Sequence, residues 1–273
     1  MSASKVWFIS GASRGFGRIW TEGALRRGDR VAATARDANA LADLKERFGD
    51  ALLTLTMDVT RQQEVVAAVN KAHQHFGKID LVISNAGNGL MGAVEETALD
   101  EARANFETNV LGTLAVIQAA LPLLRAQKHG HILLVTSVGG LITFPLGGIY
   151  QATKFAVEGL GQTLAQEVAE FGIKVTMIEP GPFNTEFMSQ SSMKQARPMP
   201  EYDAMRVQLA ATLTPAMFGD PSATVEALFK VADAEDPPLH FIMGGLTPLV
   251  RQCYAARLDG WTKWETVSAA AQG

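Results

Sequence analysis

KVWFISGASRGFG, residues 5–17, is the stretch of this 273-residue chain that decides the fold. Its first six residues form a mostly apolar, β-rich run, as in a short buried strand. Glycines follow at 11, 15 and 17, and apolar residues then recur at helical spacing from Ile19 to Leu25. A strand, a glycine-rich turn and a helix in this order direct backbone N–H groups at one point, which suits a pyrophosphate. The spacing G-x-x-x-G-x-G differs from the G-x-G-x-x-G dinucleotide fingerprint, so the turn alone could also be an ordinary loop.

Strands and helices alternate along the rest of the chain. The predicted strands are 5–10, 30–35, 51–57, 80–84, 130–136, 173–179 and 239–243, and the predicted helices are 15–27, 38–47, 61–76, 99–126, 149–171 and 221–233. This alternation indicates parallel βαβ units. We therefore expect an α/β fold, a doubly wound (Rossmann) parallel seven-stranded sheet with helices on both faces. Near-continuous apolar strands such as 130–136 suit a sheet that is covered on both sides.

The pattern indicates one domain spanning 1–273, with no repeat and no linker. Prolines interrupt the segment 186–220, which we expect to be a substrate lid inserted over the carboxyl edge of the sheet. From Leu246 onward, aromatic residues at helical or near-helical spacing predict a C-terminal helix that packs on the domain or on a neighbouring subunit.

Tyr150 and Lys154 lie four residues apart on a predicted helix, so they share one face of it. An ammonium beside a phenol favours the phenolate, so we expect Lys154 to lower the tyrosine pKa toward neutrality. Such a tyrosine can exchange a proton with a carbonyl or alcohol oxygen near pH 7. Ser137 closes an apolar strand thirteen residues upstream and could polarise the same oxygen. Alone, such a pair is more often structural than catalytic; its context reverses this preference.

Together these motifs resemble the short-chain dehydrogenase/reductase family in its common single-domain form, over nearly all of residues 5–185. SGASRGFG (10–17) is similar to the family's T-G-x-x-x-G-x-G, and SNAG (84–87) to its N-N-A-G. In both, a serine replaces the first residue, which affects local hydrogen bonds and leaves the chemistry intact. Pro180, Gly181 and Thr185 match the P-G-x-x-x-T segment near the nicotinamide.

The resemblance implies a catalytic tetrad of Asn109, Ser137, Tyr150 and Lys154. In this family the lysine also holds the nicotinamide ribose, and the asparagine positions a water. The resemblance further implies a cofactor site made of Gly11, Ser13, Arg14, Gly15, Phe16, Gly17, Arg36, Asp58, Val59, Asn85, Ala86, Gly87, Tyr150, Lys154, Pro180, Gly181, Phe183 and Thr185. It also implies a homodimer or homotetramer.

The end of the second predicted strand indicates NADP(H) as the cofactor. An acidic residue there would bind the ribose hydroxyls of NAD, but Ala35 takes that place and Arg36 follows. Arg36 and Arg14 could together grip a 2′-phosphate. Asp37 complicates this prediction, because its carboxylate could turn inward.

The expected substrate is a small apolar ketone or aldehyde, or the corresponding alcohol. Methionine is flexible and polarizable, and five of the ten methionines fall between 188 and 217, so the lid could adapt to bulky ketones; they could equally pack a cap helix. The predicted pocket residues are Leu90, Met91, Phe144, Phe187 and Met188, whereas Glu186 reads as a charge on the lid surface. Two other functions stay open: an epimerase or dehydratase that retains NAD(P), and a non-catalytic module that senses NADPH.

Composition excludes several classes of protein. The net charge is −4, and acidic and basic residues are interspersed, so the sequence has no basic patch that would bind a phosphate backbone. We therefore expect no nucleic-acid partner. Cys253 is the only cysteine, which fits a reducing compartment, and we expect a cytoplasmic protein without a signal peptide. The apolar run Val110–Leu124 is interrupted and too short to span a membrane, and reads as a buried helix. The five histidines suggest surface or capping roles and no metal site.

Overall fold

The seven predicted strands form one parallel sheet in the computed structural model, which describes residues 4–272. The strands are β1 (Val6–Ile9), β2 (Arg30–Ala35), β3 (Leu52–Thr56), β4 (Leu81–Ser84), β6 (Gly130–Val135), β7 (Ile173–Pro180) and β9 (His240–Met243). Their order is β3-β2-β1-β4-β6-β7-β9, and every neighbouring pair is parallel. The predicted α/β fold is therefore confirmed, with strand ends within two residues of expectation.

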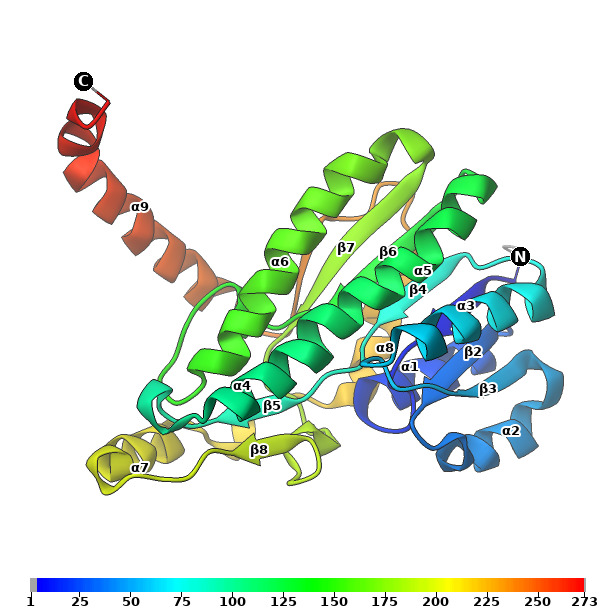
Figure 1. Cartoon of the computed structure of the whole chain (residues 1–273), viewed down its shortest axis with the longest axis horizontal. Helices are drawn as coiled ribbons and strands as arrows, with labels where there is room; N and C mark the ends of the chain where they lie inside the picture. Colours follow the sequence, from blue (N-terminus) through cyan, green and yellow to red (C-terminus); the bar gives the residue numbers. More distant parts are fainter. Residues whose placement is uncertain (1–3, 273) are drawn as a thin grey trace.

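Helices cover both faces of this sheet (Figure 1). One apolar core joins the sheet to α3 (Gln62–Phe76), α5 (Gly112–Gln127) and α6 (Gly148–Val168). The other joins it to α1 (Gly15–Arg26), α2 (Ala42–Phe48) and α8 (Thr224–Asp233). Alternate side chains of β1 supply both cores, with Val6 and Phe8 on one face and Trp7 and Ile9 on the other.

The direction of strand order reverses between β1 and β4, and this reversal places a crevice at their carboxyl ends. Ser10 closes that end of the sheet, since its Oγ accepts hydrogen bonds from the backbone N–H groups of Asn85 (2.9 Å) and Ala86 (3.1 Å). The serine that departs from the family motif therefore joins the two strand ends that flank the crevice.

The predicted helix 99–126 is continuous but not uniform. It consists of α4 (Leu99–Phe106), a π-helical turn at Glu107–Leu111, and α5. The run has 29 residues, and an 18-residue stretch of it has a mean hydropathy of 1.4, so it is long and apolar enough to cross a membrane by length and composition alone. The helix is therefore longer than the apolar run 110–124 that was predicted to be too short, but α4 adds the charged residues Asp100, Glu101 and Arg103 to it and no apolar stretch. One side of α5 nevertheless packs in the core, through Val116, Ala120 and Leu124.

The lid contains structure that the sequence did not predict. β5 (Gly89–Met91) and β8 (Met193–Gln195) form a separate two-stranded parallel sheet. A further helix, α7 (Asp203–Thr212), is tied to the body of the protein where Arg206 pairs with the buried carboxylate of Glu96. The segment 186–220 therefore packs against the part of the chain that follows β4, through the β5–β8 pairing and the Arg206–Glu96 ion pair.

The C-terminal helix α9 (Thr247–Ala270) projects away from the sheet (Figure 1). Only Val250 among its residues is buried, and Cys253 is partly buried beside it. Trp261 and Trp264 are 63% and 68% exposed. Of the two predicted alternatives, packing on its own domain holds only as far as Cys253, and packing on a neighbouring subunit stays a prediction.

Candidate active site

The glycine-rich turn brings the start of α1 close to β4. A Cβ on Gly11, which has a φ of +67°, would lie 2.8 Å from the Cα of Ala86. A Cβ on Gly17 would lie 2.3 Å from the carbonyl oxygen of Gly11. Neither position can carry a side chain without movement of the backbone. Phe16 packs behind the turn, stacked on Trp20 and edge-on to Phe183.

Gly15 presents its N–H at the N-terminus of α1, and an anion already occupies it. The Glu186 carboxylate accepts this hydrogen bond at 3.0 Å, and so stands where a phosphate oxygen would bind. Arg14 is held nearby by the Oγ and carbonyl oxygen of Ser191. Glu186 is therefore not the simple lid-surface charge that the sequence suggested. The contact shows that the turn accommodates a negatively charged oxygen, as a pyrophosphate requires.

The end of β2 presents a positive charge. Ala35 is buried, and the Arg36 side chain is exposed directly after it. Asp37 does not turn inward, because its carboxylate accepts a hydrogen bond from the N–H of Asn39 at 2.9 Å and caps the following turn. The pKa of Asp58 is lowered: burial opposes its charged form, but hydrogen bonds from Thr60 and the charge of Arg36 outweigh burial.

The segment after β4 connects the glycine turn with the catalytic residues. The Asn85 amide donates to the carbonyl oxygens of Ser10 (3.0 Å) and Gly11 (2.9 Å). A Cβ on Gly87 would lie 3.1 Å from Asn109 Oδ1 and 3.8 Å from Lys154 Nζ. Ser13 lies in the turn, partly exposed, whereas the Val59 side chain packs in the core, so Val59 can meet a ligand only through its backbone.

Tyr150 and Lys154 lie on one face of α6 and are both buried. Lys154 Nζ donates to the carbonyl oxygen of Val135 at 2.9 Å and is 5.8 Å from the centre of the Tyr150 ring. Ser137 Oγ accepts from the Gly139 N–H at 3.0 Å, and its hydroxyl is 3.5 Å from the Pro180 carbonyl oxygen. The structure thus brings together the serine, tyrosine and lysine that the sequence singled out.

Burial is the largest cause of the pKa shifts of Tyr150 and Lys154. It raises the pKa of Tyr150 to about 12, against the opposing effect of a hydrogen bond with Ser137. It lowers the pKa of Lys154 to about 8, against the opposing charge of Glu158. The tyrosine pKa therefore moves opposite to the expected direction, because loss of water penalises the phenolate more than the distant ammonium favours it.

Asn109 is held in the π-helical turn by a network of amides. Its Oδ1 accepts from the Asn88 N–H at 2.9 Å, and its Nδ2 donates to the Asn88 carbonyl oxygen (2.9 Å) and to Thr153 Oγ1 (3.0 Å). Thr153 in turn donates to the Tyr150 carbonyl oxygen at 2.6 Å. Neither Asn88 nor Thr153 was predicted as a site residue, although Asn88 directly follows the SNAG motif and Thr153 lies between Tyr150 and Lys154.

The predicted pocket residues do not all occupy equivalent places. Phe187 faces the tyrosine, with 5.7 Å between the ring centres of Phe187 and Tyr150. Phe144 is 38% exposed on a loop whose backbone is held by the Gln151 amide. Leu90 and Met91 lie in β5, where Leu90 is buried, and Met188 is 52% exposed.

The segment after β7 completes this edge of the sheet. The Gly181 N–H donates to the Met243 carbonyl oxygen at 3.0 Å, which ties the segment to β9. Thr185 Oγ1 accepts from the Phe187 N–H at 3.3 Å and begins the helical turn that carries Glu186 and Phe187. Pro180 to Thr185 therefore positions the lid against both the turn and the tyrosine.

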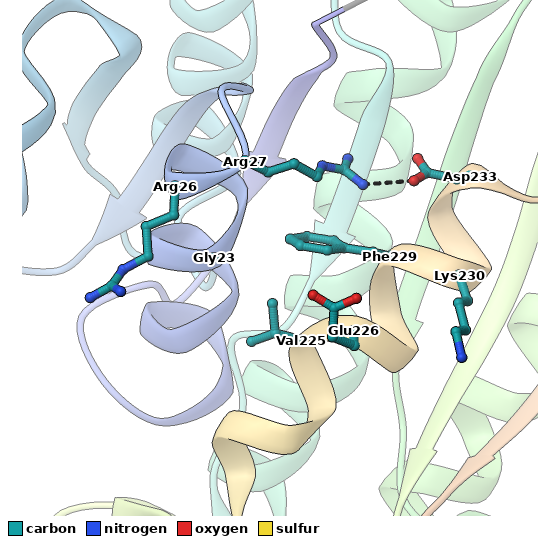
Figure 2. Close-up of a pocket in the computed structure, with 8 residues that line it drawn as sticks. All are labelled: Gly23, Arg26, Arg27, Val225, Glu226, Phe229, Lys230 and Asp233. Atoms are coloured by element: carbon teal, nitrogen blue, oxygen red, sulfur yellow. Dashed lines mark hydrogen bonds and ion pairs between the residues drawn. The ribbon is translucent and has the colours of Figure 1, made fainter. Parts of the chain in front are cut away.

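A separate cavity of about 600 Å³ lies between α1 and α8 (Figure 2). It is lined at the far end of α1 by Arg26 and Arg27, away from the glycine turn. Arg27 is paired with Asp233 across it at 2.7 Å. This cavity therefore does not belong to the candidate active site.

Comparisons with known proteins agree with this geometry. The short chain dehydrogenase family model matches residues 5–196. The chain is 41% identical over 245 residues to oxidoreductase BOA17 of Botryotinia fuckeliana, covering 88% of this chain and 89% of that protein. The chain therefore belongs to the short-chain dehydrogenase/reductase family and is an oxidoreductase of the class that acts on CH–OH and C=O groups.

Solved structures show the same fold and the class of cofactor. A short-chain dehydrogenase from Streptomyces avermitilis superposes with a TM-score of 0.91 at 34% identity, over 98% of this chain and 99% of that chain. An alcohol dehydrogenase from Thermococcus sibiricus complexed with 5-hydroxy-NADP matches with a TM-score of 0.73 at 25% identity, over 88% and 96%. A Burkholderia phymatum family member in complex with NAD gives 0.77 at 26% identity, over 91% and 92%. The Thermococcus sibiricus and Burkholderia phymatum proteins are thus each solved with a nicotinamide dinucleotide.

Proposed function

We propose that this protein is an NADP(H)-dependent oxidoreductase that interconverts an apolar ketone or aldehyde and its alcohol, with Tyr150 as general acid and base. The observation that carries this proposal is the position of Tyr150. Tyr150 is buried on α6 with its ring centre 5.7 Å from that of the apolar Phe187 of the lid, and Ser137 is near enough for a hydrogen bond that favours its phenolate. All three lie at the sheet edge where the glycine turn presents its N–H groups.

A bound dinucleotide supplies or takes up the hydride. The chain supplies the proton and the polar groups around the substrate oxygen. With a pKa of about 12, Tyr150 carries its proton throughout the neutral range and can donate it to a developing alkoxide. The Ser137 hydroxyl can donate a second hydrogen bond to the same oxygen. A charged Lys154, whose pKa is about 8, would stabilise the phenolate that remains.

Preference for NADP(H) is supported by the end of β2. No carboxylate closes this strand, Arg36 is free to turn toward a 2′-phosphate, and Asp37 is engaged in capping the next turn. A planar guanidinium suits a dianionic phosphate because it can donate two parallel hydrogen bonds. Arg14 lies on the facing turn and would have to release Ser191 to add its charge.

An apolar substrate is supported by the residues around Tyr150. Phe187 covers the tyrosine ring, and Phe144 stands partly exposed on the loop between Ser137 and Tyr150. Both are aromatic, and neither can pair with a substrate carboxylate or phosphate. We further propose that the protein is cytoplasmic and forms a homodimer or homotetramer. Exposed Leu99 (71%) and Leu111 (50%) on the helix run 99–127 support the second point.

The test follows NADPH absorbance against a panel of aromatic and aliphatic ketones, with wild type and Tyr150→Phe. We expect wild-type turnover of at least one ketone and a loss of kcat of about 100-fold or more in the variant, since the general acid is removed. Cofactor affinity, measured by fluorescence titration, should change little. An unchanged kcat in the variant would refute the role of Tyr150. Tight retention of NAD without net consumption would favour an epimerase or dehydratase, and binding without turnover a sensor.

A further inference from the structure

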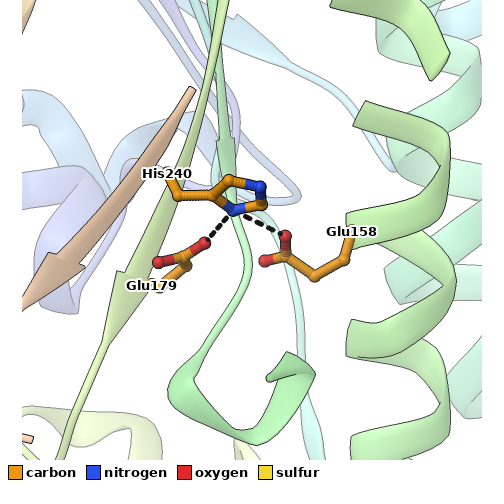
Figure 3. A group of neighbouring side chains, drawn as sticks. All are labelled: Glu158, Glu179 and His240. Carbon is orange, nitrogen blue, oxygen red and sulfur yellow. Dashed lines mark hydrogen bonds and ion pairs between the residues drawn. The ribbon is translucent and has the colours of Figure 1, made fainter. Parts of the chain in front are cut away.

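Three ionisable side chains from three different elements meet beside the carboxyl end of the sheet (Figure 3). Glu158 comes from α6, Glu179 from β7 and His240 from β9. One ligand atom from each lies within 4.8 Å of the others. His240 Nδ1 is 2.6 Å from Glu179 Oε1 and 3.4 Å from Glu158 Oε2. This cluster could not be predicted from the sequence, because its members are far apart along the chain.

Both carboxylates are buried, and most of their oxygens lack a donor. Glu158 is 3% exposed and Glu179 is fully buried. Within residues 4–272, three of their carboxylate oxygens accept no hydrogen bond: both oxygens of Glu158, and Oε2 of Glu179. Lys154 is one turn away from Glu158, but its ammonium donates to the Val135 carbonyl oxygen instead. Buried carboxylate oxygens without a donor are costly unless a cation satisfies them.

We propose that Glu158, Glu179 and His240 form a binding site for one divalent transition-metal cation of the Zn²⁺ class. Two carboxylates and a neutral imidazole balance a charge of +2, whereas His240 alone can supply only one positive charge. One nitrogen and two oxygen ligands suit Zn²⁺ better than the all-oxygen sites of Ca²⁺ and Mg²⁺. The fourth position would be open to water.

The geometry needs little rearrangement for this role. Ligand atoms around tetrahedral Zn²⁺ at about 2.0–2.2 Å lie roughly 3.3 Å apart. The contact between His240 Nδ1 and Glu158 Oε2 already has this spacing. The distance between His240 Nδ1 and Glu179 Oε1 is shorter and would have to increase. Rotating the Glu179 carboxylate, so that its unpartnered Oε2 faces the metal, achieves this. The His240 side chain is 39% exposed, so it lies between solvent and the two carboxylates and offers a path of entry.

The alternative occupant is a proton. Burial raises the pKa of Glu158 to about 7 and that of Glu179 to about 8, so without a cation the pair would hold protons near neutrality. A metal ion and protons compete for the same oxygens. The two cases differ in stoichiometry, in the response to chelators and in the atoms around the metal.

The site is separate from the catalytic tetrad but adjoins it. Glu158 lies four residues after Lys154 on α6, and Glu179 immediately precedes Pro180. A cation here would fix the end of β7 relative to α6 and offset the Glu158 charge that acts on Lys154. Its role would therefore be to position these elements, without contact with the substrate.

The test uses the full chain without a histidine tag. Metal-free protein is titrated with Zn²⁺ against a chromogenic chelator, and thermal unfolding is recorded with and without Zn²⁺. We expect one equivalent per chain, a rise in Tm on adding Zn²⁺, and a loss of affinity of about tenfold or more in His240→Ala and Glu179→Gln. His129→Ala is the matched control, because His129 also contacts a carboxylate, that of Asp80, but at the surface. It should bind Zn²⁺ as the wild type does.

Two results would overturn the proposal. One is the absence of stoichiometric Zn²⁺ binding at micromolar concentrations, which would leave protons as the occupants. The other is equal affinity in wild type and His240→Ala, which would place the metal elsewhere. If the variants fail to fold, X-ray absorption of Zn²⁺-loaded wild type decides: one nitrogen and two carboxylate oxygens support the site, and any other protein ligand set refutes it.

Discussion

At the residue scale, Arg36 is the side chain on which cofactor preference depends most directly. It follows the buried end of β2, and its charge reaches Asp58 across the end of β3. A charge-assisted contact of this kind contributes about 1.5–3 kcal/mol, which is roughly 10- to 150-fold in affinity. Arg36→Asp should therefore lower the ratio of kcat/KM for NADPH to that for NADH by at least about tenfold. Steady-state kinetics with both cofactors measure this ratio.

Arg125→Asp is the matched control for Arg36→Asp. It makes the same change in net charge at the last turn of α5, where the Arg125 guanidinium lies 5.9 Å from the centre of the Phe171 ring. The ratio should stay at the wild-type value in this variant. An equal fall in both variants would mean that overall charge, and not a contact at the 2′-phosphate, sets the preference.

At the scale of elements, the lid competes with the cofactor for the start of α1. Glu186 places its carboxylate on the Gly15 N–H, the position that a phosphate oxygen would take. An anion at a helix N-terminus is stabilised by about 0.3–1 kcal/mol, so displacing it should cost a factor of roughly two to five. We therefore expect Glu186→Ala to lower the dissociation constant of the dinucleotide by about that factor in fluorescence titration. Glu201→Ala, a lid charge away from this turn, is the control; weaker binding in Glu186→Ala would show that Glu186 supports the bound state.

The same elements show how far the sequence could go. All seven strands and the six helices on the sheet could be predicted, because apolar runs and periodicity are local signals. β5 and β8 could not, because each has three residues and they pair across about a hundred positions of chain. The π-helical turn at Glu107–Leu111 depends on hydrogen-bond register, which composition does not encode. Within the candidate site, the tetrad is a prediction from motifs, but the tyrosine pKa depends on burial, which only the fold determines.

At the scale of the whole molecule, the carboxyl edge of the sheet gathers the chemistry that the sequence disperses. The glycine turn, the amide network of Asn88 and Asn109, the tyrosine on α6 and the lid come from four separate stretches of chain. Side-chain contacts join them: Glu186 of the lid to the Gly15 N–H, Asn109 to the Asn88 N–H, and Phe187 to the Tyr150 ring. None of these candidate site residues lies on α9, which leaves the body of the protein after Cys253.

The part of α9 that projects beyond Ala256 should accordingly be dispensable for folding. Truncation after Ala256 keeps Val250 and Cys253, which pack with Leu141, Ile142 and Ile242, and removes exposed Leu258, Trp261, Trp264 and Val267. Surface changes of this kind alter stability by about 0.5 kcal/mol or less each, so the free energy of unfolding should change by less than about 1 kcal/mol. Urea unfolding of the truncated and full-length chains tests this at low and high protein concentration. A loss of several kcal/mol that grows with concentration would show that α9 packs against another copy of the chain.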